Sequence, residues 1–454
     1  QEEGALVCES GEAGACRLAK GTIDADMSGI AALERVDALT GLSRGSDFLQ
    51  RCNAFRTEHP DTPCWLVKID MGHLRMFNEW HGKRAGDELL VDVGSVLAEV
   101  EAQGKGVAGY WDQDDFTLLM PVGEVDVAAL LARLEEVIRV RDDAVGFRPS
   151  MGVYPLDPGE EVGIDQYARA QFANNRAKKN FKDRIAYFSP AEYLKSEKEH
   201  ELLSEFQHAI SDGSIMFYVQ PQYDIDSGRI VGGEALARWR RPDGSFVSPA
   251  DFVPVLEKTG FVAMLDKFIW QEVFRWMRRC LDAGEGLVPI SINVSRVDVV
   301  SFDVAGFLEL LEAQYGVQPS LVKVEITETA YSLEQEAVDA LADRLKGTGH
   351  AIYMDDFGSG QSSLNTLKNT RVDVIKLDRT FMPVNPEELE RSTRIINSIV
   401  TMAHSLRLPI IVEGVETADH VALLRSMGVR YVQGFYFGRP MTCEDFEALI
   451  ARPD

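Results

Sequence analysis

The chain is poor in cysteine, histidine and positive charge, and it lacks a long apolar run. Its 454 residues include only 6 cysteines and 8 histidines, and neither a CxxC pair nor an HExxH motif occurs. These absences argue against a disulfide framework and a zinc site. A bound metal would therefore have oxygen ligands, which favours magnesium or manganese. No apolar run approaches the roughly 20 residues that a membrane-spanning helix needs.

The charge balance is strongly acidic, with 47 Lys and Arg residues against 72 Asp and Glu and a formal net charge of −25. A long nucleic acid needs a basic surface, so we expect no nucleic-acid polymer as a partner. A small phosphate ligand remains compatible, because bound cations and a few local Arg or Lys residues can invert the field. We expect a cytoplasmic protein that makes no membrane contact through this chain. Because the chain begins at Gln1 rather than Met, there is room upstream for a sensor domain or an inner-membrane anchor.

The pattern of apolar residues divides the chain into four segments. We expect residues 1–36 to be an N-terminal segment or linker, the end of a missing sensor domain, and residues 37–188 to form a smaller α+β domain. Residues 189–200 are charged with a helical pattern, which predicts a linker helix. Residues 201–454 contain eight strand-like runs, each followed by a helical stretch. This α/β alternation predicts a (β/α)8 barrel of the TIM type, although an open doubly wound sheet shares it.

Polar residues in the second half are placed at the carboxyl ends of the predicted strands. The set consists of Glu234, Asn293, Glu325, Asp355, Asp356, Lys376, Glu413 and Gln433. In a barrel these ends converge on one face, where the carboxylates would repel one another unless cations neutralised them. Taken singly, each residue is as well explained by a helix cap or a surface ion pair. The joint pattern instead predicts a site for hard divalent ions, with Asp355 and Asp356 able to bridge two of them.

At these residues the chain resembles the EAL family of cyclic di-GMP phosphodiesterases, over roughly residues 200–452. The family's naming motif stands here as Glu234-Ala235-Leu236, and it is followed in order by "ISINVSR", "EITET", "DDFGSG", "IKLD", "VEGVE" and "QGFYFGRP". The resemblance implies a hydrolase that converts cyclic di-GMP to linear pGpG with two Mg²⁺ or Mn²⁺ ions. It also implies a homodimer. A catalytically dead receptor that only binds cyclic di-GMP is the alternative.

The resemblance also assigns roles by position. The first metal would be held by Glu234, Asn293, Glu325 and Asp355, and the second by Asp355, Asp356 and Glu413. Lys376 would orient or help activate the attacking water, and Arg238, Gln220 and Gln433 would contact the substrate or its surroundings. Glu328 and Glu416 would support the ligands, with Glu328 steadying the loop after "DDFG".

One departure concerns the loop after the Asp pair. It reads "DDFGSGQSSL", where the family usually has Thr at the position of Ser359 and Tyr at the position of Gln361. Ser359 retains the hydroxyl, whereas Gln361 lacks the aromatic ring. We therefore expect an effect on the rate or on dimer coupling rather than a loss of activity.

Residues 37–188 resemble, less closely, the GGDEF family of diguanylate cyclases. The matching stretches are "DALTGLSR" and "KIDMGHLRMFNEWHGKRAGDELL". By position, Asp70 and Asp114 would be metal ligands, and Asn78 and Asp87 would read guanine. Lys178 and Lys182 would contact the terminal phosphates.

The motif that names this second family is broken. Where the family has Gly-Gly-Asp-Glu-Phe, the chain has Asp112-Gln113-Asp114-Asp115-Phe116. Glycine lets the backbone approach a nucleotide closely, and two side chains now stand there. We therefore expect no cyclase activity, so a bifunctional enzyme is disfavoured. Two interpretations remain open: the domain binds GTP without turnover and regulates the barrel, or it is a folded spacer and dimer surface.

Overall fold

The computed structural model describes residues 35–141, 147–358, 371–383 and 386–451. The chain divides into two compact units, the first ending at Glu201 and the second beginning at Leu202. Most of the predicted segment 1–36 lies outside the described residues. No helix in the described ranges is both long and apolar enough to span a lipid bilayer.

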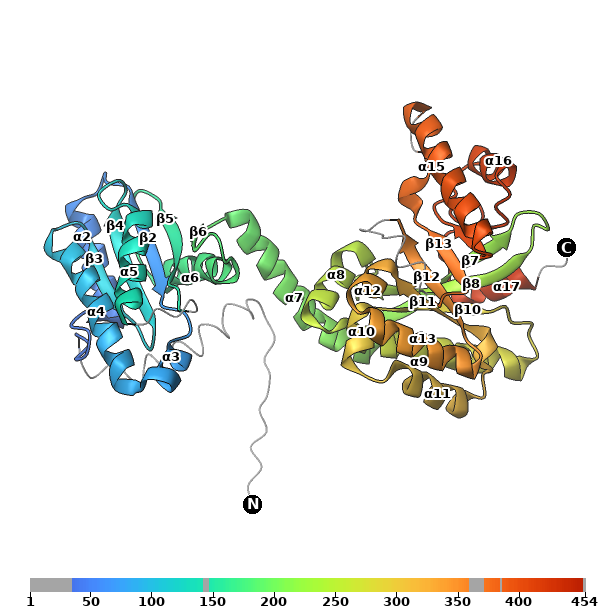
Figure 1. Cartoon of the computed structure of the whole chain (residues 1–454), viewed down its shortest axis with the longest axis horizontal. Coiled ribbons are helices and arrows are strands. Elements are labelled where there is room, and N and C mark those ends of the chain that lie inside the picture. The colour runs from blue at the N-terminus through green and yellow to red at the C-terminus, as the bar shows by residue number, and fades with distance from the viewer. Residues whose placement is uncertain (1–34, 142–146, 359–370, 384–385, 452–454) are drawn as a thin grey trace, which may run out of the picture. The chain divides into compact units, whose positions relative to one another are not determined.

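The first unit is an α+β domain built on one six-stranded sheet (Figure 1). Its elements are β1 (Ser43–Arg44), α2 (Gly45–Glu58), β2 (Cys64–Asp70), α3 (Leu74–His81), α4 (Lys83–Ala102), β3 (Val107–Tyr110), β4 (Asp115–Pro121), α5 (Val127–Arg141), β5 (Ser150–Leu156), α6 (Ile164–Lys179) and β6 (Ile185–Tyr187). The strand order is β1-β3-β4-β2-β5-β6, with β2 antiparallel to β4 and to β5. The central strand β2 is almost wholly buried, because helices pack against both faces of the sheet.

Helix α7 (Pro190–Asp212) begins at the predicted linker and continues to Asp212, so the boundary between the units falls within it. The elements of the second unit are β7 (Ile215–Asp224), β8 (Ile230–Arg240), β9 (Phe246–Val247), α8 (Pro249–Thr259), α9 (Val262–Ala283), β10 (Ile290–Val294), α10 (Arg296–Ser301), α11 (Val304–Tyr315), η1 (Pro319–Leu321), β11 (Val322–Thr327), α12 (Glu328–Leu333), α13 (Gln335–Thr348), β12 (Ala351–Phe357), β13 (Val374–Leu377), η2 (Arg379–Phe381), α15 (Pro386–Ser405), β14 (Ile410–Val412), α16 (Ala418–Ser426), β15 (Tyr431–Gln433) and α17 (Cys443–Ile450).

The predicted barrel is confirmed, with one difference in strand direction. Strands β10 to β15, β7 and β8 are paired in succession, and the β10–β8 pairing closes the ring. Strand β7 runs antiparallel to both β15 and β8, whereas the sequence pattern predicted a helix after every strand. The reason lies in the short turn after Asp224, where Gly228 adopts a φ of 71° and returns the chain directly into β8.

The barrel strands alternate apolar and polar side chains. In β11, Val322, Val324 and Ile326 are buried in the hydrophobic core, whereas Lys323 and Glu325 take the other face of the strand. Helices α9, α11 and α13 lie side by side over the outside (Figure 1). The apolar core therefore lies between strands and helices, and the interior of the barrel is left to polar groups.

Candidate active site

One buried lysine is the centre of the polar barrel interior. The Nζ atom of Lys376, in β13, forms ion pairs with four carboxylates from four other strands or strand ends. The Nζ–O distances are 2.6 Å to Glu325, 2.6 Å to Glu413, 3.0 Å to Asp355 and 3.1 Å to Glu234. Because these strands close into a barrel, residues more than 170 positions apart in the sequence meet at one ammonium group.

A network of amides fixes Glu234 from the other side. Gln433 Nε2 donates to Glu234 Oε2 at 2.7 Å and to Gln220 Oε1 at 3.1 Å. Asn293 Nδ2 donates to Glu234 Oε1 at 3.1 Å, so both oxygens of this carboxylate have partners. Gln222 Nε2 donates to Gln433 Oε1 at 3.1 Å. The orientation of Glu234 is therefore set before any ligand binds.

The protonation of the cluster reflects its excess of acid. Burial, with repulsion from Glu234, raises the pKa of Glu325 well above its usual range, and burial raises the pKa of Glu413 to about 8. Against the opposing effect of burial, Lys376 and Gln433 hold the pKa of Glu234 below its usual range. Near neutral pH some of these acids must therefore keep a proton or gain a further cation.

The donor set fits divalent cations. Oxygens of Glu234, Glu325 and Asp355 lie within 4.8 Å of one another, and so do oxygens of Asp355, Asp356 and Glu413. Asp355 belongs to both groups, which is the arrangement that two neighbouring ions need. Glu325 Oε1 is buried and has no hydrogen-bond partner among the described residues. An unpaired buried carboxylate oxygen is costly, and a hard cation is the partner it suits.

The backbone at the Asp pair is constrained. Asp356 adopts a φ of 54°, and burial, with repulsion from Asp355 and Asp378, raises its pKa to about 6. Glu328 is buried, and its Oε2 accepts a hydrogen bond from the Gly358 backbone N–H at 2.7 Å. Glu328 thus holds the first residue after "DDF", whereas the loop after "DDFG", which Glu328 was predicted to steady, lies outside the described residues. Ser359 and Gln361 lie outside the described residues.

Two other predicted residues lie at the margins. Arg238, at the carboxyl end of β8, is half-buried with its guanidinium 5.6 Å from the centre of the Tyr218 ring. Its Nη1 donates to the Ala237 carbonyl at 2.8 Å, and no ion pair to the carboxylate cluster is found within the described ranges. Glu416 is exposed, and its backbone N–H donates to His420 Nδ1. The structure does not bring the Glu416 carboxylate into the cluster.

The first domain has an acid cluster of its own at the ends of β2 and β4. Oxygens of Asp70, Asp114 and Asp115 lie within 4.8 Å of one another. Lys178 Nζ lies 2.5 Å from Asp70 Oδ2, and Lys68 Nζ forms an ion pair with Asp115 Oδ1. Lys182 is exposed, and among the described residues it forms no ion pair with these three acids.

The predicted guanine-reading residues lie next to each other. Asp87 lines a cavity of about 270 Å³ together with Leu39 and Arg84. Asn78 Oδ1 is buried, without a hydrogen-bond partner in the described part of the chain. This oxygen lies so close to Gly86 that a Cβ atom added to Gly86 would be only 1.7 Å from Asn78 Oδ1. Gly86 is therefore required for Asn78 to approach the helix that carries Asp87.

The broken motif carries backbone strain. Gln113 adopts a φ of 51°, a left-handed conformation that glycine adopts without a steric penalty. Two hydrogen bonds hold it there: its N–H donates to Asp112 Oδ1 at 2.9 Å, and its carbonyl accepts from the Tyr110 hydroxyl at 2.8 Å. The hairpin thus keeps a backbone conformation that is typical of glycine, although Gln113 carries a long side chain at that position.

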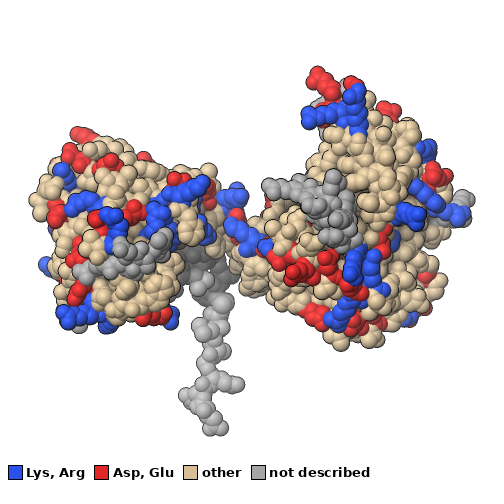
Figure 2. All heavy atoms as spheres, viewed as in Figure 1, with Lys and Arg blue, Asp and Glu red and all other residues tan. Residues whose placement is uncertain are grey.

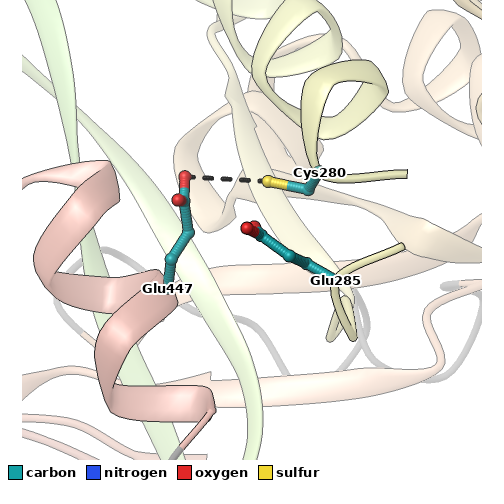
Figure 3. A group of neighbouring side chains, drawn as sticks. All are labelled: Cys280, Glu285 and Glu447. Atoms are coloured by element: carbon teal, nitrogen blue, oxygen red, sulfur yellow. Dashed lines mark hydrogen bonds between the residues drawn. The ribbon is translucent and has the colours of Figure 1, made fainter. Parts of the chain in front are cut away.

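A third cluster has a different character. Cys280, Glu285 and Glu447 point toward one another, with donor atoms within 4.8 Å (Figure 3). Glu447 Oε1, however, already accepts hydrogen bonds from Trp276 Nε1 at 2.6 Å and Arg279 Nη2 at 2.5 Å. Burial raises the pKa of the Cys280 thiol to about 12, so the thiolate that binds metals is disfavoured. We treat this group as an ion-paired helix contact.

Three polar residues that contribute to these clusters were not predicted from the sequence. Lys68 interrupts the apolar run "CWLVKID", and that interruption was the available signal. Asp378 follows the strand of Lys376, so it carried the same signal as the other strand-end acids. Gln222 lies two residues after Gln220 on the same face of β7, and only the closed barrel brings it to Gln433.

Comparison with known families gives two matches. The EAL domain matches residues 203–440, and the diguanylate cyclase GGDEF domain matches residues 34–184.

Charged side chains of both signs are interspersed on the visible faces of the two regions (Figure 2).

Curated relatives cover most of the chain. An uncharacterized signaling protein of Caulobacter vibrioides is 31% identical over 89% of this chain and 50% of its own length. The bifunctional diguanylate cyclase/cyclic di-GMP phosphodiesterase MucR of Pseudomonas aeruginosa is 28% identical over 85% of this chain and 57% of its own. The cyclic di-GMP phosphodiesterase NbdA of the same organism is 27% identical over 92% and 54%. The chain thus spans about half the length of these relatives.

Solved structures match as well. The PaMucR phosphodiesterase in complex with c-di-GMP has a TM-score of 0.51 and 30% identity, and it covers 54% of this chain and 99% of its own. The EAL enzyme Bd1971 in its cGMP-bound form has a TM-score of 0.52 and 22% identity over 75% of this chain and 82% of its own, a likeness of fold alone.

Proposed function

The chain belongs to the EAL domain family, with a GGDEF domain in front, and on that premise we propose that its barrel hydrolyses cyclic di-GMP to linear pGpG with two divalent metal ions. The proposal rests on one observation above all. Four carboxylates pair with a single lysine inside the barrel, and a fifth, Asp356, lies beside two of them. That excess of buried negative charge suits two cations, and the matching family and the c-di-GMP-bound relative supply the substrate class.

The residues divide the work as follows. Glu234, Asn293, Glu325 and Asp355 would hold one ion, and Asp355, Asp356 and Glu413 the other. Two ions held there would polarise the phosphoryl group and lower the pKa of the attacking water. Lys376 holds the carboxylates together, and it would orient or help activate the attacking water. Gln433 and Asn293 hold Glu234 in one orientation, which preserves the geometry of the ligands.

Arg238 would contact a phosphate of the substrate. Its guanidinium is half-buried at the rim, and burial lowers its pKa, so a phosphate would be a favourable partner. Gln220 is buried beside Gln433, with its Nε2 donating to the Gly438 carbonyl at 3.2 Å. Its Oε1 accepts from Gln433, so a ligand would reach it by rearrangement of this network.

Turnover of cyclic di-GMP tests the proposal. The full chain is incubated with Mg²⁺ or Mn²⁺, with and without a chelator, and pGpG is measured by chromatography. We expect metal-dependent pGpG that is lost in Glu234→Ala and retained in Glu336→Gln, which changes an exposed glutamate of α13. Binding of cyclic di-GMP without pGpG would instead make the protein a receptor.

We further propose that the GGDEF domain, residues 37–188, binds GTP without turning it over and regulates the barrel. Asp87 lines a cavity and Asn78 packs against the neighbouring Gly86, which supports binding, and the strained Gln113 hairpin argues against cyclase chemistry. GTP should then change the rate of pGpG formation, and Asn78→Ala should abolish the change. A rate independent of GTP would make this domain a spacer. Formation of cyclic di-GMP from GTP by Glu234→Gln would restore the bifunctional alternative.

We also propose a cytoplasmic homodimer with the barrel domain at residues 201–454 and a linker at 189–200. Four described cysteines are free, which suits a reducing compartment. Sedimentation of the full chain, with and without cyclic di-GMP and Mn²⁺, tests the oligomeric state.

A further inference from the structure

Lys68 is a fully buried lysine in the central strand of the first domain. It stands in β2 between Val67 and Ile69, and its side chain is 0% exposed. An ammonium group removed from water costs several kcal/mol unless an opposite charge and hydrogen bonds compensate it. The position of Lys68 is therefore explained only by the groups around its Nζ atom.

Those groups are the acids at the strand ends. Asp70 and Asp115 are directly opposite in the antiparallel β2–β4 pair, and like charges at such positions repel. Lys68 Nζ forms an ion pair with Asp115 Oδ1 and lies 5.4 Å from the centre of the Tyr167 ring. The Tyr167 hydroxyl donates to Asp115 Oδ2 at 3.3 Å. Lys178, from α6, forms an ion pair with Asp70, with its Nζ atom 2.5 Å from Asp70 Oδ2.

By distance alone this acid cluster could hold a metal ion, because the oxygens of Asp70, Asp114 and Asp115 lie within 4.8 Å. Its charge, however, differs from that of the barrel site. Three carboxylates here face two ammonium groups, whereas five carboxylates in the barrel face one. Lys178 is 38% exposed and can turn away, but Lys68 is enclosed by the sheet and α6.

We propose that Lys68 is a built-in substitute for a divalent cation at the Asp70–Asp114–Asp115 cluster, so that this cluster takes up neither Mg²⁺ nor Mn²⁺. The residues therefore do not fit the metal that a nucleotide cyclase site requires. Phosphoryl transfer that depends on a metal bridging the phosphates is excluded at this cluster. This inference is independent of whether the barrel hydrolyses cyclic di-GMP.

Counting bound Mn²⁺ tests the proposal directly. The full chain is titrated with Mn²⁺, and free Mn²⁺ is measured by electron paramagnetic resonance. Wild type and Asp70→Asn should bind the same number of ions. Lys68→Met, which keeps the length of the side chain but removes the charge, should gain one ion per chain. The gain should disappear in Lys68→Met/Asp70→Asn, and Lys179→Met, at an exposed lysine of the same helix as Lys178, should show no gain.

Two results would overturn the proposal. One is the loss of a bound ion in Asp70→Asn relative to wild type, because a metal would then already bind at the cluster. The other is an unchanged ion count in a Lys68→Met protein whose circular dichroism and thermal transition match wild type. If Lys68→Met does not fold, the comparison of wild type with Asp70→Asn still decides the proposal.

Discussion

The two acid clusters of this chain are alike in their ligands and different in their balance of charge. Each gathers Asp or Glu side chains at the ends of strands that converge in the fold. In the barrel one lysine forms ion pairs with four carboxylates, and burial raises the pKa values of Glu325 and Glu413. In the GGDEF domain two lysines each form an ion pair with one aspartate. The two clusters therefore differ in the number of internal cations per carboxylate, and under our two proposals this number decides which cluster takes up metal ions.

The largest effect should come from the residue that both barrel groups share. Asp355→Asn removes a charge from the ligands of both proposed ions, so kcat/KM for cyclic di-GMP should fall by roughly a thousandfold. Steady-state kinetics with Mn²⁺ measures this. Asp251→Asn, at an exposed acid in the first turn of α8, serves as the control. A fall of less than tenfold in Asp355→Asn would contradict the shared role.

The lysine of the barrel should matter most when metal is absent. Lys376→Met leaves several buried carboxylates without a cation, so in a chelator the free energy of unfolding of the barrel should fall by about 3 kcal/mol. Mn²⁺ should raise the melting temperature of the variant more than that of wild type, because a competing cation has been removed. Calorimetry of the full chain in EDTA and in Mn²⁺ measures both. Equal melting temperatures in EDTA would show that Lys376 is not needed to balance the acids.

A carboxylate with its own cation should behave in the opposite way to the crowded acids. Hydrogen bonding to Arg430, at 2.7 Å, lowers the pKa of Asp224 to about 2, below the usual value near 4. Its contribution is therefore complete above pH 4 and is lost as the pH falls toward 2. Asp224→Asn should cost about 1–2 kcal/mol at pH 7. Denaturant unfolding at pH 7, 5 and 3 measures the difference, which should shrink only at the lowest pH.

The smallest effect should come from the strained hairpin. Gln113→Gly relieves a left-handed backbone conformation, offset in part by the flexibility of glycine in the unfolded chain, so stability should rise by up to about 1 kcal/mol. Gln103→Gly, at a φ of −81°, is the matched control and should give no gain. Thermal unfolding of the two variants separates the outcomes. If the Lys68 proposal holds, Gln113→Gly should also leave the protein without cyclase activity.

Much of the site could be predicted from the sequence because its signals are local. Each proposed ligand belongs to an apolar strand-like run, and such a run is recognisable in the sequence without its neighbours. Glu325 and Asp355 lie near the carboxyl ends of β11 and β12, as predicted, whereas Glu234 lies in the middle of the longer strand β8. Ring closure nevertheless brings oxygens of the three residues within 4.8 Å of one another. Glu416 carried the same local signal in "VEGVE" but is exposed, whereas the preceding residue, Val415, is buried in the core.

The sequence by itself determined the two domain types, the barrel and the residues at its strand ends, since these follow from short periodic patterns and ordered motifs. Only the tertiary structure decided the direction of β7, the encirclement of Lys376 by four acids and the pairing of buried Lys68 with Asp115. These features depend on strand register and ring closure, which join residues tens to hundreds of positions apart. A charge pattern along the chain shows how many acids and lysines there are, but their pairing is set by the packing that buries them together.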